Sequence, residues 1–204
     1  RGCLGPGKRG IGFAVGREPL ASLFAAEGCE IVASDLVQRS SLRAWGTSGQ
    51  LAASREAVRW PGLVDETSFE DRVRFRHLDM RDLSSLPAES FDFCWSSCAM
   101  EHLGSLERGV RFVVDALAKL RPGGVAVHTT EYNVTSDDKT LERGDSVVYR
   151  RRDVERLDRR LRERCCGLEA LDFDPGVAAH DLCFDEEPFY RQGREHVKLK
   201  IGKF

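Results

Sequence analysis

Short apolar runs alternate along the chain with segments whose apolar residues recur every three or four positions. Runs of this length predict buried strands, and the three-to-four spacing predicts amphipathic helices. The predicted strands are residues 10–15, 30–34, 73–78, 91–96 and 125–129, and the predicted helices are residues 19–27, 40–60, 106–120 and 151–164. Strands that alternate with helices favour a parallel sheet with helices on both faces.

Two late apolar runs, residues 168–173 and 197–204, bring the predicted sheet to seven strands. The fold class that follows is α/β, with a doubly wound, mainly parallel seven-stranded sheet; an antiparallel pairing of the late strands stays open. No linker interrupts the pattern, so residues 1–204 are predicted to form a single domain. The chain begins at Arg1 without Met and ends at Phe204 within a strand-like run, so truncation at both ends also stays open.

Composition and charge argue against a nucleic-acid partner. The 204 residues are 41% hydrophobic and 31% charged, which is an ordinary globular balance. The formal net charge of -2 lacks the basic excess that is typical of nucleic-acid binders. The segment 150–164 has eight Arg, but four acidic residues are interspersed among them. This mixture favours a solvated helix face over an RNA-binding face, so no nucleic-acid partner is expected.

The cysteines bear on the cellular compartment. There are seven, an odd number, and no CxxC pair occurs. This pattern favours reduced thiols in a reducing compartment. No signal peptide is visible, and no apolar run approaches the ~18 residues that span a bilayer. We therefore expect a cytoplasmic protein without membrane association.

Acidic residues end the second and third predicted strands. In a doubly wound sheet, ligands lie beyond the carboxyl ends of the strands, where the first loop offers backbone amides and a helix N-terminus. Asp35 is placed to accept hydrogen bonds from a ribose, with Leu36 beside it. Asp79 is placed to accept from an adenine amino group, with Met80 against the ring. A helix cap or an ordinary polar strand end is the alternative for either acid.

The most specific motif lies in the middle of the chain. Residues 91–103 combine an F-D-apolar strand, a short polar loop and then Glu101-His102-Leu103. A helix follows, and then a turn signal at residues 121–124 leads into another strand. From about Lys8 to Tyr132, this order resembles the class I methyltransferases that use S-adenosylmethionine. The resemblance implies that S-adenosylmethionine is the cofactor and that its methyl group is transferred to an acceptor.

The glycine loop departs from that family. Counting back from Asp35, the glycines of the family's G-x-G-x-G fall at Ala14, Gly16 and Glu18. The acidic residue that the family has near the end of its first strand falls at Gly12. Ala14 is still small enough for close approach of a ligand. Glu18 starts a helix, where a carboxylate is favoured, and is placed to pair with the cofactor's ammonium; a plain first-turn Glu is the alternative.

The altered glycine loop also bears on which ligand and which function the sequence favours. A pyrophosphate requires an uncharged, glycine-rich cradle, so Glu18 favours S-adenosylmethionine over a dinucleotide. A nicotinamide-dependent oxidoreductase therefore ranks low. A catalytically inactive methyltransferase-like protein that binds a nucleotide or a partner is the main alternative, because only one of the three glycines remains.

The reaction itself needs few groups. Methyl transfer from a sulfonium is an in-line displacement, in which positioning and desolvation do much of the work. A hydroxyl acceptor also needs a general base, for which His102 is the candidate; a structural His that caps the next helix is the alternative. Ser96, at the end of the fourth strand, joins the predicted cofactor site. The predicted substrate-binding residues follow the fifth strand and are Glu131, Tyr132 and Asn133.

The sequence predicts no metal site. Carboxylates and imidazoles from neighbouring strand ends are ligands for divalent metals, but their spacing here matches no metal signature. These residues are Glu101, His102, His128, Glu131 and His180. The expected partner is a small-molecule acceptor, such as a sugar or natural-product hydroxyl or amine. The sequence leaves the acceptor's identity, the methylated atom and the oligomeric state open.

Overall fold

The computed structural model describes residues 2–36, 51–186 and 198–200. Its internal contacts divide the chain into two compact units. The first comprises Arg1–Glu131 with Glu142–Val147, and the second comprises Tyr132–Leu141 with Val148–Phe204. The single domain of residues 1–204 stays a prediction. No helix in the described part of the chain is long and apolar enough to cross a membrane.

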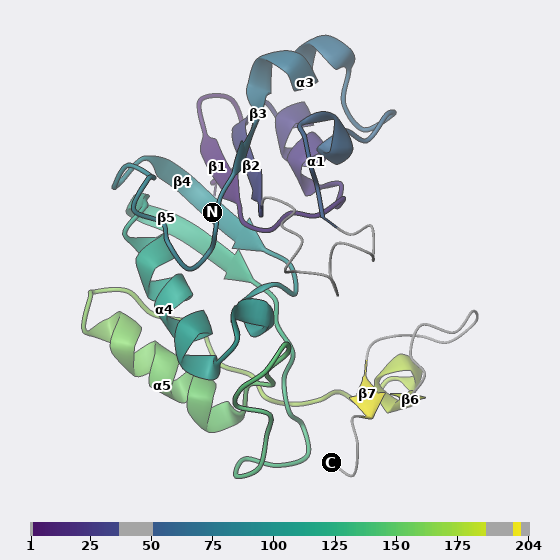
Figure 1. Ribbon diagram of the computed structural model, residues 1–204, viewed down its shortest axis with the longest axis vertical. Helices are drawn as coiled ribbons and strands as arrows, with labels where there is room; N and C mark the ends of the chain where they lie inside the picture. The colour runs from purple at the N-terminus through teal and green to yellow at the C-terminus, as the bar shows by residue number, and fades with distance from the viewer. Residues whose placement is uncertain (1, 37–50, 187–197, 201–204) are drawn as a thin grey trace. The chain divides into compact units, whose positions relative to one another are not determined.

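The first unit is built on a parallel sheet of five strands in the described ranges (Figure 1). The strands are β1 (Arg9–Gly12), β2 (Glu30–Asp35), β3 (Val73–His77), β4 (Phe91–Ser96) and β5 (Leu120–His128). Their order is β3-β2-β1-β4-β5, and every neighbouring pair is parallel. The order reverses between β1 and β4, so a ligand is expected at the carboxyl ends of these two strands. The predicted parallel α/β sheet is confirmed, and the count of seven strands is not.

Helices cover both faces of this sheet. They are α1 (Leu20–Ala26), α3 (Glu66–Arg72) and α4 (Leu106–Leu117), with the short 3-10 helices η1 (Glu56–Val58) and η2 (Met100–Leu103). On α1, the ring of Phe24 lies 5.0 Å from that of Trp95. On α4, the ring of Phe112 lies 5.2 Å from that of His128, which pairs in register with Ser96. Trp95 and Ser96 are neighbours in β4 and point to opposite faces, so α1 and α4 lie on opposite faces of the sheet.

Two glycines in β1 make room for aromatic rings. A side chain at Gly10 would overlap the ring of Phe93, and one at Gly12 would overlap the indole of Trp95. Both aromatic residues belong to β4, which pairs with β1, and both are nearly fully buried. Glycine in β1 therefore lets the two rings lie across the strand beneath α1.

Strand β5 differs from the prediction at its start. The turn expected at residues 121–124 lies inside the strand, which already begins at Leu120. Phe91 pairs with Leu120 and Phe93 pairs with Val125, so extra residues bulge out between the two pairs. Gly123 has a φ of 80°, which suits the bulge because glycine adopts this conformation without strain. The turn residues therefore form a β-bulge.

Two other predictions need correction. The helix predicted over residues 40–60 falls partly outside the described residues, and its described part contains only η1. The prediction also missed α3, which begins after Asp65. The carboxylate of Asp65 accepts a hydrogen bond from Ser68 N and so caps the helix.

The second unit contains α5 (Arg151–Arg162), the 3-10 helix η3 (Ala179–Leu182) and the strands β6 (Asp185–Glu186) and β7 (Leu199–Lys200). Along α5, Arg151 pairs with Glu155 and Arg162 pairs with Asp158, as expected of a solvated, mixed-charge helix face.

The late strands differ from the prediction. Residues 168–173 form no strand. Strand β7 lies within the predicted run 197–204, but it pairs in parallel with β6, in a two-stranded sheet separate from the central one. The antiparallel arrangement that the sequence left open for the late strands does not occur between β6 and β7.

Candidate active site

The loop after β1 has the backbone of a glycine loop, although it keeps few glycines. Ala14 and Gly16 both have positive φ angles, of 48° and 52°. They occupy the positions of the family's first two glycines. The loop is anchored on both sides, since Phe13 N donates to Trp95 O at 2.9 Å and Val15 N donates to Ser34 O at 3.1 Å. Alanine in the left-handed region is strained by about 1–2 kcal/mol, so these anchors hold Ala14 in an unfavourable conformation.

Asp35, at the end of β2, binds this loop through its side chain. Its carboxylate is fully buried and accepts three backbone hydrogen bonds, from Gly16 N (3.2 Å), Leu36 N (2.7 Å) and Ala52 N (2.8 Å). Burial raises the pKa of Asp35, and the three hydrogen bonds oppose that rise. Asp35 therefore joins the glycine loop to the segment before η1, a role that the sequence did not reveal.

Glu18 places a carboxylate over the carboxyl end of β4. Its Oε1 accepts a hydrogen bond of 2.5 Å from the indole Nε1 of Trp95. Burial raises the pKa of Glu18, while hydrogen bonds from Ser97 and Trp95 act in the opposite direction. Because the indole covers Gly12, the strand has no room there for the family's acid. The same indole instead holds a carboxylate from the other side of the loop.

His102 lies on η2, close behind β4. Its Nδ1 is 2.8 Å from the backbone oxygen of Asp145. A carbonyl oxygen only accepts hydrogen bonds, so Nδ1 carries the proton and Nε2 carries the lone pair of the neutral ring. Nε2 lies 4.0 Å from Glu101 Oε1, and a quarter of the side chain (25%) is exposed. The Asp145 carbonyl thus orients the ring, and part of the side chain reaches solvent.

Glu101 is buried, and only one of its two carboxylate oxygens accepts a hydrogen bond among the described residues. Its side chain is 1% exposed, and its Oε2 accepts a hydrogen bond of 3.0 Å from Thr130 Oγ1. Its Oε1 has no hydrogen-bond partner among the described residues. Burial raises the pKa of Glu101, and the nearby carboxylate of Glu131 adds to the rise. A buried carboxylate oxygen in this state calls for a cation or a donor from a ligand.

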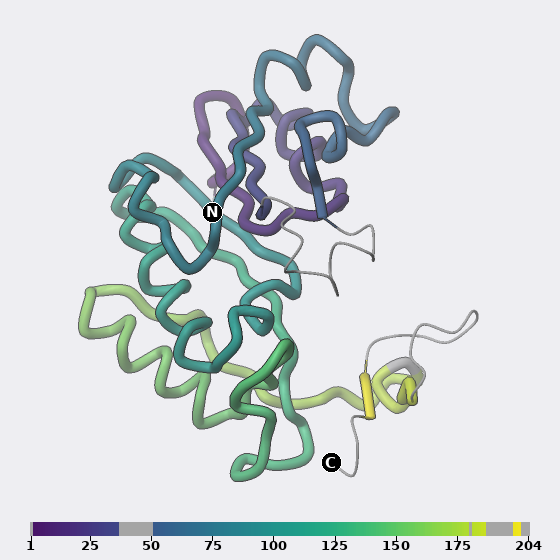
Figure 2. Tube along the Cα trace, viewed as in Figure 1, coloured from purple at the N-terminus to yellow at the C-terminus, as the bar shows by residue number. Residues whose placement is uncertain are grey.

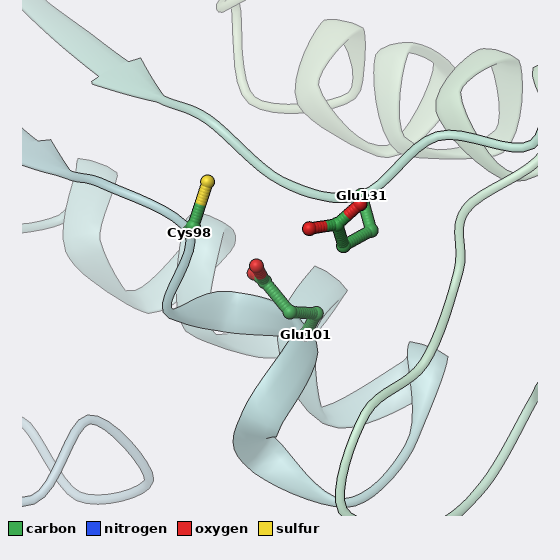
Figure 3. Close-up of side chains that lie close together, drawn as sticks. All are labelled: Cys98, Glu101 and Glu131. Atoms are coloured by element: carbon green, nitrogen blue, oxygen red, sulfur yellow. The ribbon is translucent and has the colours of Figure 1, made fainter. Parts of the chain in front are cut away.

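Cys98, Glu101 and Glu131 converge beside His102 (Figure 3). The thiol and the two carboxylates each have a ligand atom within 4.8 Å of the others. Cys98 and Glu101 follow β4, and Glu131 follows β5; these strands run side by side, as the chain trace in Figure 2 shows. Cys98 is not among the predicted site residues, because its approach depends on a positive φ of 44° that no sequence pattern signals.

A model of a family described as "Methyltransferase domain" matches residues 11–128, which is more than half of the chain. The chain belongs to the class I S-adenosylmethionine-dependent methyltransferases. Membership assigns S-adenosylmethionine to it as cofactor. The matched residues contain the whole five-stranded sheet apart from the first two residues of β1, and include Glu18, Asp35 and His102.

Solved structures resemble this methyltransferase at low identity. The S-adenosylmethionine-dependent methyltransferase from Mesorhizobium loti is 21% identical, over 66% of this chain and 51% of that one, with a TM-score of 0.42. The cyclase SpnF is 18% identical, over 77% of this chain and 51% of that one, with a TM-score of 0.55, a likeness that bears on the fold alone. The chain thus spans about half the length of these two proteins. No curated protein matches it.

Two further predicted residues of the methyltransferase already have partners in their own unit. The carboxylate of Asp79 accepts hydrogen bonds from Nη2 of Arg81 at 2.6 Å and from Nε at 2.9 Å. Met80, the next residue, is buried. Ser96 Oγ lies 2.8 Å from Nδ1 of His128, and burial lowers the pKa of His128 to about 4. The His128 ring is therefore neutral at pH 7 and packs against α4.

The predicted substrate residues fall in different units. Glu131 belongs to the first unit, whereas Tyr132 and Asn133 belong to the second. The ring of Tyr132 stacks on Phe173 at 5.7 Å. The side chain of Asn133 accepts from Ser136 N and donates to the backbone of the same loop, so it shapes that loop. The side chain of His180, considered as a metal ligand, lies outside the described residues.

Proposed function

We propose that this methyltransferase transfers the methyl group of S-adenosylmethionine to a small-molecule acceptor, such as a sugar or natural-product hydroxyl or amine. The observation that carries the proposal is the Glu18 carboxylate, held by Trp95 where the loop after β1 meets the end of β4. The cofactor's ammonium and sulfonium are both cationic, and a half-buried carboxylate favours cations there. The same carboxylate disfavours the pyrophosphate of a dinucleotide.

The remaining cofactor contacts follow the strand ends. We assign the adenosine to the carboxyl ends of β2 and β3, with Asp35 and Leu36 toward the ribose and Asp79 and Met80 toward the adenine. Three hydrogen bonds fill three of the roughly four acceptor positions of the Asp35 carboxylate. A ribose hydroxyl would take the fourth position or replace the bond from Ala52. Ala14, Gly16 and Ser96 would line the same crevice.

For a hydroxyl acceptor, His102 acts as the base. The acceptor oxygen attacks the methyl carbon, the bond from carbon to sulfur breaks, and the product is S-adenosylhomocysteine. The acceptor's proton passes to Nε2 of His102, because Nδ1 is committed to Asp145. Glu101, 4.0 Å from Nε2, stabilises the imidazolium that forms. Glu131, in the same unit as His102, is assigned to the acceptor side.

A small acceptor is favoured over a nucleic acid. Three Arg side chains of α5 pair with acidic residues of the same unit: Arg151 with Glu155, Arg152 with Asp138 and Arg162 with Asp158. These acidic partners interrupt the positive charge that a nucleic-acid surface needs. A cytoplasmic location is proposed too, on the basis of seven free cysteines.

Transfer of an isotopically labelled methyl group tests the proposal. The protein is incubated with methyl-labelled S-adenosylmethionine and a fractionated metabolite extract, and label is counted separately in small molecules, protein and nucleic acid. We expect label in the small-molecule fraction, and a loss of at least tenfold in rate for His102→Asn with unchanged cofactor affinity. Glu107→Gln, on the exposed start of α4, is the control. Label confined to macromolecules, or cofactor binding without any transfer, would contradict the proposal.

A further inference from the structure

We propose that Cys98, Glu101 and Glu131 form a binding site for one divalent metal ion of the zinc class, with a coordination position left for an exogenous ligand. This departs from the expectation, drawn from the sequence, of no metal. Three protein ligands and one open position are the arrangement of zinc ions that take part in reactions.

The buried oxygen of Glu101 points to a cation. The Glu101 side chain is almost completely buried, and its Oε1 has no hydrogen-bond partner in the described part of the chain. Figure 3 shows its carboxylate directed between the Cys98 sulfur and the Glu131 carboxylate. Thr130 Oγ1 donates to the other oxygen, which fixes the orientation of the group. A metal ion would bind this oxygen, whose contact with Nε2 of His102, at 4.0 Å, is too long for a hydrogen bond.

The three groups are close enough to share one ion. A tetrahedral zinc ion with bonds of about 2.0–2.3 Å holds two of its ligand atoms about 3.3–3.7 Å apart. The ligand atoms here lie within 4.8 Å of one another, so side-chain shifts of about 1 Å bring them to that spacing. Cys98 is exposed and Glu131 is half-buried, so both side chains have room for such shifts.

The sulfur distinguishes a metal from an organic cation. An ammonium ion would satisfy the two carboxylates but gain little from a thiol, whereas zinc binds thiolates strongly. Magnesium and calcium prefer oxygen ligands alone. The backbone holds Cys98 in place, because its N–H donates to both oxygens of Thr129, at 3.0 and 3.2 Å, with φ at 44°. A strained residue held this firmly at a cluster of ligand atoms supports a binding role.

Titration with cobalt tests the site without cofactor or acceptor. The reduced protein is titrated with Co²⁺ in the absence of oxygen, and thiolate-to-cobalt charge-transfer absorption is recorded. We expect one Co²⁺ per chain with a thiolate band that Zn²⁺ abolishes by competition, accompanied by release of the Cys98 thiol proton. Because no methyl transfer is involved, failure here leaves the proposed function standing, and the reverse also holds.

Variants locate the ion. Cys98→Ser should abolish the band, and Glu131→Gln should weaken Co²⁺ binding at least tenfold. Glu101→Gln should do the same if thermal denaturation shows that it folds. Cys166→Ser, which removes an exposed thiol of the second unit, is the matched control and should keep the band. Absence of a band in the folded native protein would overturn the site, as would a band that survives Cys98→Ser.

Discussion

Individual residues account for the way in which this chain differs from its family. At Gly12 the family's acid has no room, because the indole of Trp95 lies over the strand. The indole N–H donates to Glu18, so a carboxylate reaches the same region from the loop just before α1. The sequence was sufficient to predict a role for Glu18 at the cofactor's ammonium, because Glu18 stands where the family usually has a glycine. Its hydrogen bond to Trp95 could not be predicted, since 77 residues separate the two.

Replacing Glu18 tests its assigned contact with the cofactor's ammonium. Glu18→Gln should lower the affinity for S-adenosylmethionine about 10- to 100-fold, the range for a charge-assisted hydrogen bond of about 1.5–3 kcal/mol. 5′-Methylthioadenosine lacks the ammonium, so its affinity should stay unchanged. Calorimetry on both ligands measures the difference, with Glu27→Gln at the far end of α1 as control. Equal losses for both ligands would mean that Glu18 only shapes the loop.

At the scale of elements, periodicity predicted the strands and the longer helices well. The prediction for β4 has the same bounds as the observed strand, and α4 ends three residues before the predicted helix does. The short helix α3 was missed because a seven-residue helix shows little periodicity. The glycines at residues 123–124 were assigned to a turn, because the same residue type serves turns and bulges.

The packing of β1 against β4 depends on glycine. Gly12→Ala should lower the free energy of unfolding by about 1–3 kcal/mol, because the new methyl group overlaps the indole of Trp95. The same substitution should cost less in a Trp95→Leu background, where the ring is gone. Denaturant unfolding of the four proteins in this double-mutant cycle measures the coupling. Additive losses would show that the strand accommodates the methyl group by another route.

For the whole molecule, the order of the strands determines where chemistry takes place. Parallel strands whose order reverses between β1 and β4 bring the loop after β1, Asp35 and the Cys98–Glu101–Glu131 cluster to one edge of the sheet. The sequence predicted that edge of the sheet, and the binding roles of its residues stay predictions. It did not predict the Cys98–Glu101–Glu131 cluster. These side chains follow two different strands, and their approach depends on backbone angles, such as the positive φ of Cys98, that no sequence pattern reveals.

Calorimetric titration measures whether the altered glycine loop still binds S-adenosylmethionine. The folded protein is titrated with S-adenosylmethionine, with S-adenosylhomocysteine and, as control, with NADH. We expect micromolar binding of the first two and none of NADH, because Glu18 favours an ammonium and repels a pyrophosphate. No binding of either sulfur compound to protein shown to be folded, or tight binding of NADH, would contradict this expectation.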